Sequence, residues 1–441
     1  MTLKNHIDGQ KYADEFKAQA AGLPGAELPW LNELRNASIA KFAEAGLPGP
    51  RVEEWKYCNL NVLKSGAFNV SGQKTSQDTK VAALIKTALL DDIDGAKVVF
   101  VDGYFQQSLS NIDKQNGVTL TNLAGFVNSD PVNAKALFDQ SDQLNSLKDL
   151  NTALMTDGFV LVVEENTKLA EPIQIIHLSS DNSNDKALRQ RNFIQLEVGS
   201  KAQIIETFIG KNDVNCWDHN NTDVIIGEQA ALEIYQFQNE GDDTIHMAET
   251  VVDVAKGGDF KHYSLNIGGK LSRTEVKPTL NGVDCNIELR GAFLGRGGNS
   301  HDVFTHMKHM QPECNSNQVY RGVLDNGGKS AFQGKVYVAK DAQLTNADQS
   351  NKNLLLDRNA EANSKPELLI YADDVKCSHG TTVGELDAEA LFYLKSRGLA
   401  QMAAKSLLVE AFVAEVFEEI NIPTVKEKYL SLARKWLEVE G

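Results

Sequence analysis

The strongest constraint on the fold is a repeated turn-then-strand unit between Thr156 and Val375, a region in which no segment has helical periodicity. The units begin at Gly199, Gly227, Gly257, Gly282 and Gly327. The steps between them are 28, 30, 25 and 45 residues, and the long last step indicates one hidden unit. Periods of about 20–50 residues are typical of stacked, repetitive folds.

Alternation within the units predicts which side chains face the core. Cys285, Ile287 and Leu289 share one face of an extended strand, and Phe332 shares a face with Val336. Short strands with turn signals and no crossover helices fit either a parallel β-helix or an antiparallel sandwich. The pattern alone favours neither fold.

The helical periodicity that the repeats lack is present on both sides of them. We interpret residues 1–155 as a mainly helical N-terminal domain, 156–380 as the β core and 381–441 as a C-terminal helical domain. Because a β-helix leaves each end of its stack open, we expect the flanking helices to cap those ends.

The C-terminal segment carries clear helix signals. Asp387 predicts a helix start and Gly398 its end. An apolar stripe at helical spacing follows, which indicates either intramolecular core or a docking surface. The stripe consists of Met402, Val409, Val413, Val416 and Ile420.

Charge and cysteine usage exclude several classes of function. The chain has 44 basic and 60 acidic residues, a net charge of −16, so nucleic-acid and membrane partners are not expected. The start of the sequence lacks the apolar run of a signal peptide, and no stretch is long enough to span a membrane. Five scattered cysteines do not form a disulfide framework. These features predict a cytoplasmic protein.

The segment from Tyr371 to Gly384, Y-A-D-D-V-K-C-S-H-G-T-T-V-G, contains the single Cys-x-His pair of the chain. If the segment is extended, Asp373, Cys377 and His379 point to one side. A thiol and an imidazole can bind iron or zinc, but two ligands do not complete a metal site. A buried structural cysteine beside a hydrogen-bonded histidine is therefore the commoner interpretation of this spacing alone.

Two other motifs resemble a metal site and a phosphate-binding loop but lack the geometry that either site needs. His301, His306 and His309 are close in sequence, but on a strand His306 and His309 face opposite sides and cannot chelate one ion together. Lys329 follows Gly328 as in a phosphate-binding loop, yet a strand rather than a helix is predicted after it. The chain should therefore not bind ATP by this route.

Several motifs together resemble the SufB/SufD family of iron–sulfur cluster assembly proteins. The segment at Tyr371 continues as E-L-D and then A-L-F-Y-L-K-S-R-G-L. Upstream lie P-E-C-N-S-N-Q-V-Y-R-G-V-L, F-Q-G-K-V-Y-V-A-K-D-A-Q-L-T-N and N-L-L-L-D-R-N-A-E, and near the start G-L-P-G-P-R-V-E-E-W-K-Y. The resemblance spans Arg51 to Ile420 with gaps. The short chain without a C-x-x-C-x-x-x-C-type motif resembles the SufD-like branch.

The resemblance implies a mainly β protein with a right-handed parallel β-helix between N-terminal and C-terminal helical domains. It implies a non-catalytic subunit that pairs with SufB, receives the SufC ATPase at its C-terminal helices and forms a homodimer when alone. No tightly bound cofactor is expected, and ATP would act only through SufC. His379, and with it Cys377, would be a transient ligand of iron or an iron–sulfur cluster at the SufB interface.

Two alternatives from other classes remain at this point. A β-helix enzyme that acts on polysaccharides would need clustered carboxylates in a groove, and such enzymes are mostly exported. Asp373 and Asp374 are adjacent and would face opposite sides of a strand, so they cannot form such a pair. The other alternative is a homodimeric β-helix scaffold in which Cys377 and His379 have only a packing role.

Overall fold

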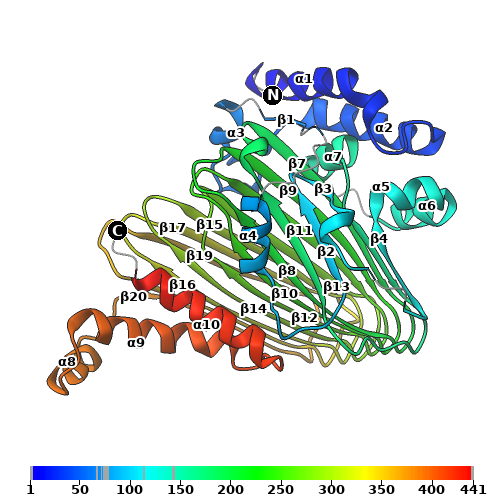
Figure 1. Ribbon diagram of the computed structural model, residues 1–441. Coiled ribbons are helices and arrows are strands. Elements are labelled where there is room, and N and C mark those ends of the chain that lie inside the picture. Colours follow the sequence, from blue (N-terminus) through cyan, green and yellow to red (C-terminus); the bar gives the residue numbers. More distant parts are fainter. Residues whose placement is uncertain are drawn as a thin grey trace.

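The structure, a computed structural model, describes residues 3–65, 68–70, 72, 79–112, 115–141 and 145–438. Its centre is a parallel β-helix in which the chain passes alternately through two sheets, as Figure 1 shows. The predicted β-helix is thereby confirmed, and the antiparallel sandwich is wrong. Antiparallel pairing is confined to the start of the stack, where β3 pairs with β2 and β4 with β5.

The first sheet has the order β19-β17-β15-β13-β11-β9-β7-β5-β4, with β1 paired to β7. Its strands are β1 (Asn69–Val70), β4 (Val118–Asn122), β5 (Phe159–Val163), β7 (Lys186–Leu196), β9 (Cys216–Ile226), β11 (Ile245–Val254), β13 (Leu271–Leu280), β15 (Ser300–His309), β17 (Lys329–Val338) and β19 (Glu361–Ile370).

The second sheet has the order β20-β18-β16-β14-β12-β10-β8-β6-β2-β3. Its strands are β2 (Lys97–Val101), β3 (Tyr104–Phe105), β6 (Ile173–Ser179), β8 (Lys201–Gly210), β10 (Ala231–Asn239), β12 (Asp259–Asn266), β14 (Asn286–Gly295), β16 (Asn315–Leu324), β18 (Asn346–Leu355) and β20 (Lys376–Gly384).

The register explains the irregular spacing of the glycines. The first four glycine units open β8, β10, β12 and β14 of the second sheet, and the hidden unit is β16, with Asn315 paired to Asn286. Gly327 precedes β17, which belongs to the first sheet. Gly327 therefore precedes a first-sheet strand, whereas the other four glycines precede second-sheet strands.

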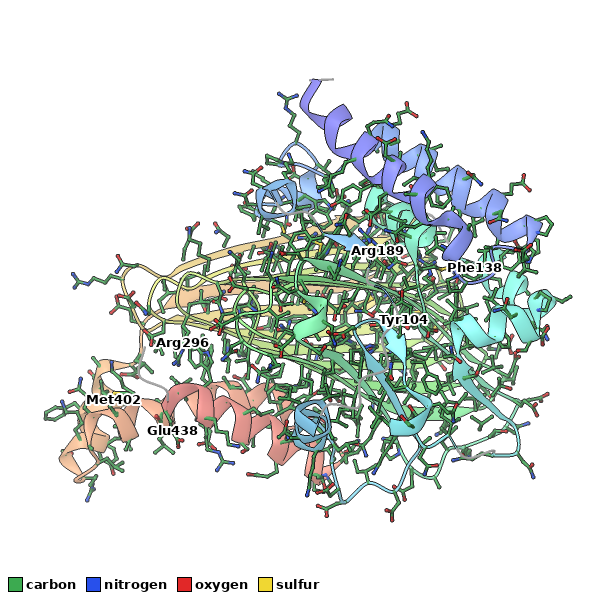
Figure 2. All side chains as sticks on the ribbon, turned by 45° about the horizontal axis from the view of Figure 1, so that its top comes forward. Tyr104, Phe138, Arg189, Arg296, Met402 and Glu438 are labelled. Atoms are coloured by element: carbon green, nitrogen blue, oxygen red, sulfur yellow. The ribbon has the colours of Figure 1, made fainter. Side chains whose placement is uncertain are left out.

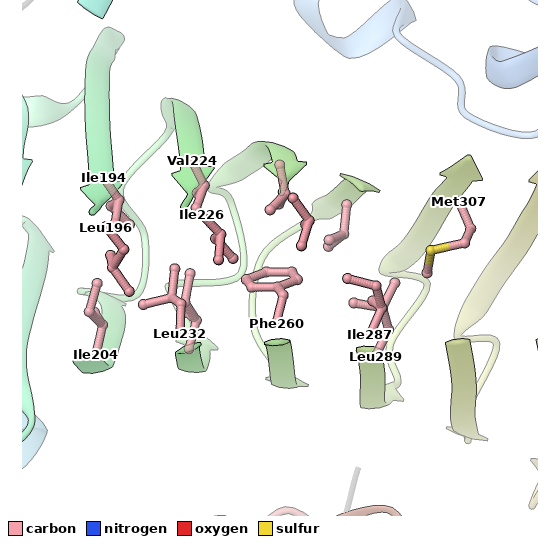
Figure 3. Packing of buried hydrophobic residues seen from close by; sticks show 14 of the residues in the cluster. Ile194, Leu196, Ile204, Val224, Ile226, Leu232, Phe260, Ile287, Leu289 and Met307 are labelled. Carbon is pink, nitrogen blue, oxygen red and sulfur yellow. The ribbon is translucent and has the colours of Figure 1, made fainter. Parts of the chain in front are cut away.

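The interior of the β-helix is apolar along one side. Figure 3 shows Ile194 and Val224 of the first sheet facing Ile204, Leu232 and Phe260 of the second. The predicted inward positions are confirmed, since Cys285, Ile287, Leu289, Phe332 and Val336 all belong to this cluster. Each fully buried aliphatic or phenylalanine side chain contributes about 1.5–3 kcal/mol, so the column holds the successive coils together.

N-terminal helices cover the outer face of the first sheet. Leu150 of α7 and Phe42 of α2 pack with Trp217 of β9 and Met247 of β11. The helices before the core are α1 (Leu3–Gln19), α2 (Pro29–Ala45), α3 (Asn61–Ser65), α4 (Thr79–Ala88), α5 (Leu123–Ser129), α6 (Pro131–Asp139) and α7 (Ser146–Leu154). Arg189, labelled beneath them in Figure 2, lies buried with its guanidinium 5.1 Å from the Trp217 ring centre.

C-terminal helices cover the outer face of the second sheet. These are α8 (Ala388–Ser396), α9 (Gln401–Ala414) and α10 (Pro423–Glu438). Val413 and Tyr429 pack with Tyr235, Phe237 and Leu265 of the strands. The expectation that helices cap the C-terminal end of the stack is wrong, because the apolar outer face of the middle coils is the surface that these helices bury.

The signals at the start of the tail are confirmed. The Asp387 side chain accepts hydrogen bonds from the backbone N–H groups of Glu389 and Ala390, and Gly398 has φ +94° after the helix. Val409, Val413 and Ile420 of the predicted stripe are buried, but Met402 is 52% exposed and does not belong to it. Among the described residues, no helix is both long and apolar enough to cross a membrane.

Candidate functional site

Strand β20 is the last strand of the second sheet, and it leaves one edge open. It pairs in parallel with β18 on one side, and no described strand pairs with its other side. β19 holds the same position in the first sheet. Most side chains of β20 are exposed, whereas the middle strands are almost wholly buried. At the C-terminal end of the stack, the outer edges of β19 and β20 therefore have no partner among the described strands.

Cys377 and His379 both lie on β20, on the face that points to the interior of the stack. Their partners in the register are Ala347 and Gln349, which are buried inward residues of β18. Cys377 is half-buried and packs against the apolar column, whereas the His379 side chain is exposed. The structure thus places the two predicted ligands together at the open end.

The thiol of Cys377 is not activated by its surroundings within this chain. Burial raises its pKa, and the nearby Asp348 carboxylate adds to the rise. A thiol with a raised pKa is protonated at neutral pH, so a metal ion must displace the proton before it can bind. Binding through Cys377 therefore needs additional ligands or a partner surface.

Asp373 does not share the ridge of Cys377 and His379. β20 begins at Lys376, and Asp373 and Asp374 lie in the bend before it, so alternation along a strand does not apply to them. Leu344 donates a backbone hydrogen bond of 2.6 Å to the Asp374 carbonyl, which fixes this bend. The predicted placement of Asp373 on one ridge with the two ligands is wrong.

The weaker motifs keep the roles predicted for them. His301 and His309 point inward from β15, while His306 lies on the opposite face, so the three histidines do not converge. His309 Nε2 lies 2.9 Å from the Ser316 hydroxyl in the interior of the stack. Strand β17 begins at Lys329, so no helix N-terminus faces a phosphate there.

A group of buried ligands was missed at the level of sequence. Asp218, Glu240 and His246 bring one oxygen or nitrogen atom each to within 4.8 Å of one another in the interior. This is the one cluster of three such groups among the described residues, so the Cys377–His379 pair gains no third ligand within the described chain. Asp218 and His246 are register partners one coil apart, a signal that appears only once the coil length is known.

Exposed apolar side chains gather on α8 and the beginning of α9. Phe392 is 74% exposed and Met402 52%, and Tyr393, Leu399 and Leu407 are also exposed. α8 has no buried residue. Met402, labelled in Figure 2, lies among the C-terminal helices away from both sheets. These five residues form what we call the α8–α9 patch.

Comparison with known proteins agrees with this architecture. The family model described as "SUF system FeS cluster assembly, SufBD core domain" matches residues 177–412, and that of the "SufBD protein N-terminal region" matches residues 7–175. An iron–sulfur cluster assembly SufBD family protein of Synechocystis is 31% identical over 440 residues, which cover 97% of this chain and 95% of that protein.

Two relatives carry a more specific name. The iron–sulfur cluster assembly protein SufD of Escherichia coli is 27% identical, over 89% of this chain and 90% of its own length. SufD of Bacillus subtilis is also 27% identical, over 99% of each chain. With both family models matched along nearly the whole sequence, the chain belongs to the SufBD family of iron–sulfur cluster assembly proteins.

Proposed function

We propose that this chain is the SufD-like, non-catalytic subunit of a complex with SufB and SufC, and that its open β-helix end shares a cluster-assembly site with SufB. The observation that carries the proposal is the position of Cys377 and His379 on the last strand, whose outer edge has no partner among the described strands. A strand edge of this kind can extend its sheet with a strand of another chain.

An incomplete site suits assembly chemistry. Iron and sulfide must bind and then leave, and two ligands from one chain with others from a partner hold a cluster less permanently than a closed four-ligand site. Iron and the nascent cluster are substrates in this scheme. Gln349 on the neighbouring strand is the register partner of His379 and would take part in its orientation.

The α8–α9 patch is the surface we assign to SufC. Exposed aromatic and aliphatic side chains in a contiguous group are typical of protein–protein interfaces. The buried stripe of α9 is already used against the second sheet, so docking would involve Phe392, Tyr393 and Met402 instead. ATP would be bound and hydrolysed by SufC alone. In the absence of SufB, the same open end would pair with a second copy of this chain.

Co-purification with SufB and SufC from the same organism tests the proposal, with anaerobic iron and sulfide loading of the isolated complex. We expect His379→Ala to leave the complex intact and to reduce loading at least about tenfold, with a smaller loss for Cys377→Ala. His306→Ala is the matched control, a histidine on the outer face of β15. Unchanged loading in His379→Ala would refute a ligand role, and failure of the wild-type chain to bind SufB would refute the subunit assignment.

A further inference from the structure

The cluster of Asp218, Glu240 and His246 lies in the polar half of the β-helix interior. Asp218 belongs to β9, His246 to β11, and Glu240 directly follows β10. The three side chains are at most 3% exposed. Their ligand atoms lie within 4.8 Å of one another, and His246 Nδ1 is 2.8 Å from Glu240 Oε2.

The charges in this cluster are not balanced by protein cations. His246 is the single ion-pair partner of Glu240 in the described chain, and no described lysine or arginine forms an ion pair with Asp218 or Glu240. Two carboxylates removed from water are costly unless positive charge or protons compensate them. A divalent cation between them would supply this compensation.

Two polar atoms of these side chains lack hydrogen-bond partners in the described part of the chain. Among the described residues, neither Glu240 Oε1 nor His246 Nε2 has a hydrogen-bond partner, although both atoms are fully buried. Buried polar atoms are satisfied in the great majority of cases, so two unsatisfied atoms within one cluster need an explanation. Coordination to a metal ion would satisfy a carboxylate oxygen and a ring nitrogen together.

Neighbouring amides hold the carboxylates in place. Asn220 Nδ2 donates to Asp218 Oδ1, and Gln238 Nε2 donates to Glu240 Oε2 over 3.0 Å. Hydrogen bonds to ligating carboxylates from such outer groups are a regular feature of metal sites. Each donor is two residues from the carboxylate that it binds: Asn220 follows Asp218 on β9, and Gln238 precedes Glu240 at the end of β10. Each carboxylate is therefore held by its own segment of the chain.

We propose that Asp218, Glu240 and His246 bind a resident divalent transition-metal ion, of the Zn²⁺, Fe²⁺ or Mn²⁺ class, inside the β-helix. Two carboxylates and one imidazole suit these ions, whereas Mg²⁺ and Ca²⁺ prefer oxygen ligands throughout. The ion would have a structural role, tying two successive coils of the first sheet to the corner after β10. It would be additional to the transient site at Cys377 and His379.

Burial determines how the ion would enter. The three ligands come from consecutive segments within 29 residues of sequence (218 to 246), so they can meet as soon as these coils form. Once the coils have closed, no ligand remains accessible to solvent. The ion would therefore be captured during folding and exchange slowly afterwards.

The test is elemental analysis of the full chain, expressed without a histidine tag in media supplemented with zinc, iron or manganese and dialysed against chelator. We expect about one equivalent of one metal in the wild type and in the Cys377→Ala, His379→Ala double variant. We expect less than a tenth of that in His246→Gln. His262→Gln, another buried interior histidine, is the matched control and should keep the metal.

A second measurement distinguishes a metal ion from a shared proton. Asp218→Asn keeps the shape of the side chain and removes one charge. If the carboxylates share only a proton, this variant should be as stable as the wild type or more so, and the wild type should contain no metal; either result would overturn the proposal. If they hold an ion, Asp218→Asn should lose it and unfold at a lower temperature, while refolding of the wild type in chelator should lower its Tm by a similar amount.

Discussion

Lys148 Nζ on α7 lies 2.6 Å from Asp223 Oδ1 on the outer face of β9, and both side chains are buried. Arg191 Nη2 on β7 binds the other carboxylate oxygen over 2.5 Å. Burial opposes ionisation of Asp223, but the two cations outweigh it and hold the pKa of Asp223 below its usual range. This ion pair joins the N-terminal helices to the first sheet.

Asp223→Asn should lower the free energy of unfolding by about 3–5 kcal/mol, because it leaves Lys148 and Arg191 as uncompensated buried cations. Chemical denaturation monitored by circular dichroism measures the effect. The control is Asp139→Asn, which breaks an exposed pair with Lys135 and should cost less than about 1 kcal/mol. Equal effects of the two substitutions would contradict the structural role of the buried pair.

His262→Gln should flatten the pH dependence of stability between pH 6.5 and 4. Burial lowers the pKa of His262 to about 4, and Glu206 only partly opposes this. The unfolded chain takes up a proton near pH 6.5 and the folded chain does not until about pH 4, so acidification through this window destabilises the wild type.

The difference between wild type and His262→Gln should approach about 1.4 kcal/mol per pH unit at its steepest. Denaturation midpoints measured at several pH values give this slope. If stability depends on pH in the same way in the two proteins, His262 binds its proton equally well in the folded and unfolded states, and the prediction is wrong.

Thr381→Pro should block pairing at the open end without disturbing the fold. The backbone N–H of Lys376 donates to the carbonyl of Thr345 in the preceding coil. Because backbone N–H groups alternate in direction along a strand, every second residue from Lys376 donates toward β18, and the N–H of Thr381 points to the unpaired outer edge of β20. Thr382→Pro is the matched control, since it removes an internal bond and should lower Tm. Size-exclusion chromatography and SufB co-purification should show loss of pairing for folded Thr381→Pro; intact pairing would place the interface elsewhere.

Phe392→Asp should reduce capture of SufC at least tenfold, because a charge replaces an exposed aromatic side chain in the α8–α9 patch. Tm should hardly change, since α8 has no buried residue. Val132→Asp on α6 is the control, an equally exposed apolar residue at the other end of the molecule. Equal SufC binding by both variants would exclude the patch as the docking surface.

Local sequence patterns predict the inward positions and the helix ends of this fold well, because alternation and helix capping each depend on a few neighbouring residues. Alternation identifies Ile287 and Phe332 as inward residues, and the Asp387 cap and Gly398 delimit a helix, without knowledge of the tertiary structure. The family resemblance was needed to choose between a β-helix and a sandwich, since both produce the same alternation. Gly327 was counted as a unit of the same series, although its strand belongs to the first sheet, because the two halves of a coil have similar turn-strand units.

Two features that the sequence did not reveal depend on the number of residues in each coil of the β-helix. Asp218 and His246 are 28 residues apart in sequence and direct register partners in space, a relationship that single-strand periodicity cannot reveal. Similarly, an apolar stripe on α9 shows that the helix is buried, but not whether it covers an end or a face of the stack. Both questions require the register between coils.

The two ends of the stack are chemically different. At the start, β3 and β4 run antiparallel to their neighbours, whereas β19 and β20 at the finish continue the parallel order. The pairing proposed above uses only the parallel end, whereas head-to-tail contacts, which generate fibres, would require the two different ends to bind each other. If subunits pair only through the parallel edges of β19 and β20, assembly through this end would close after two subunits.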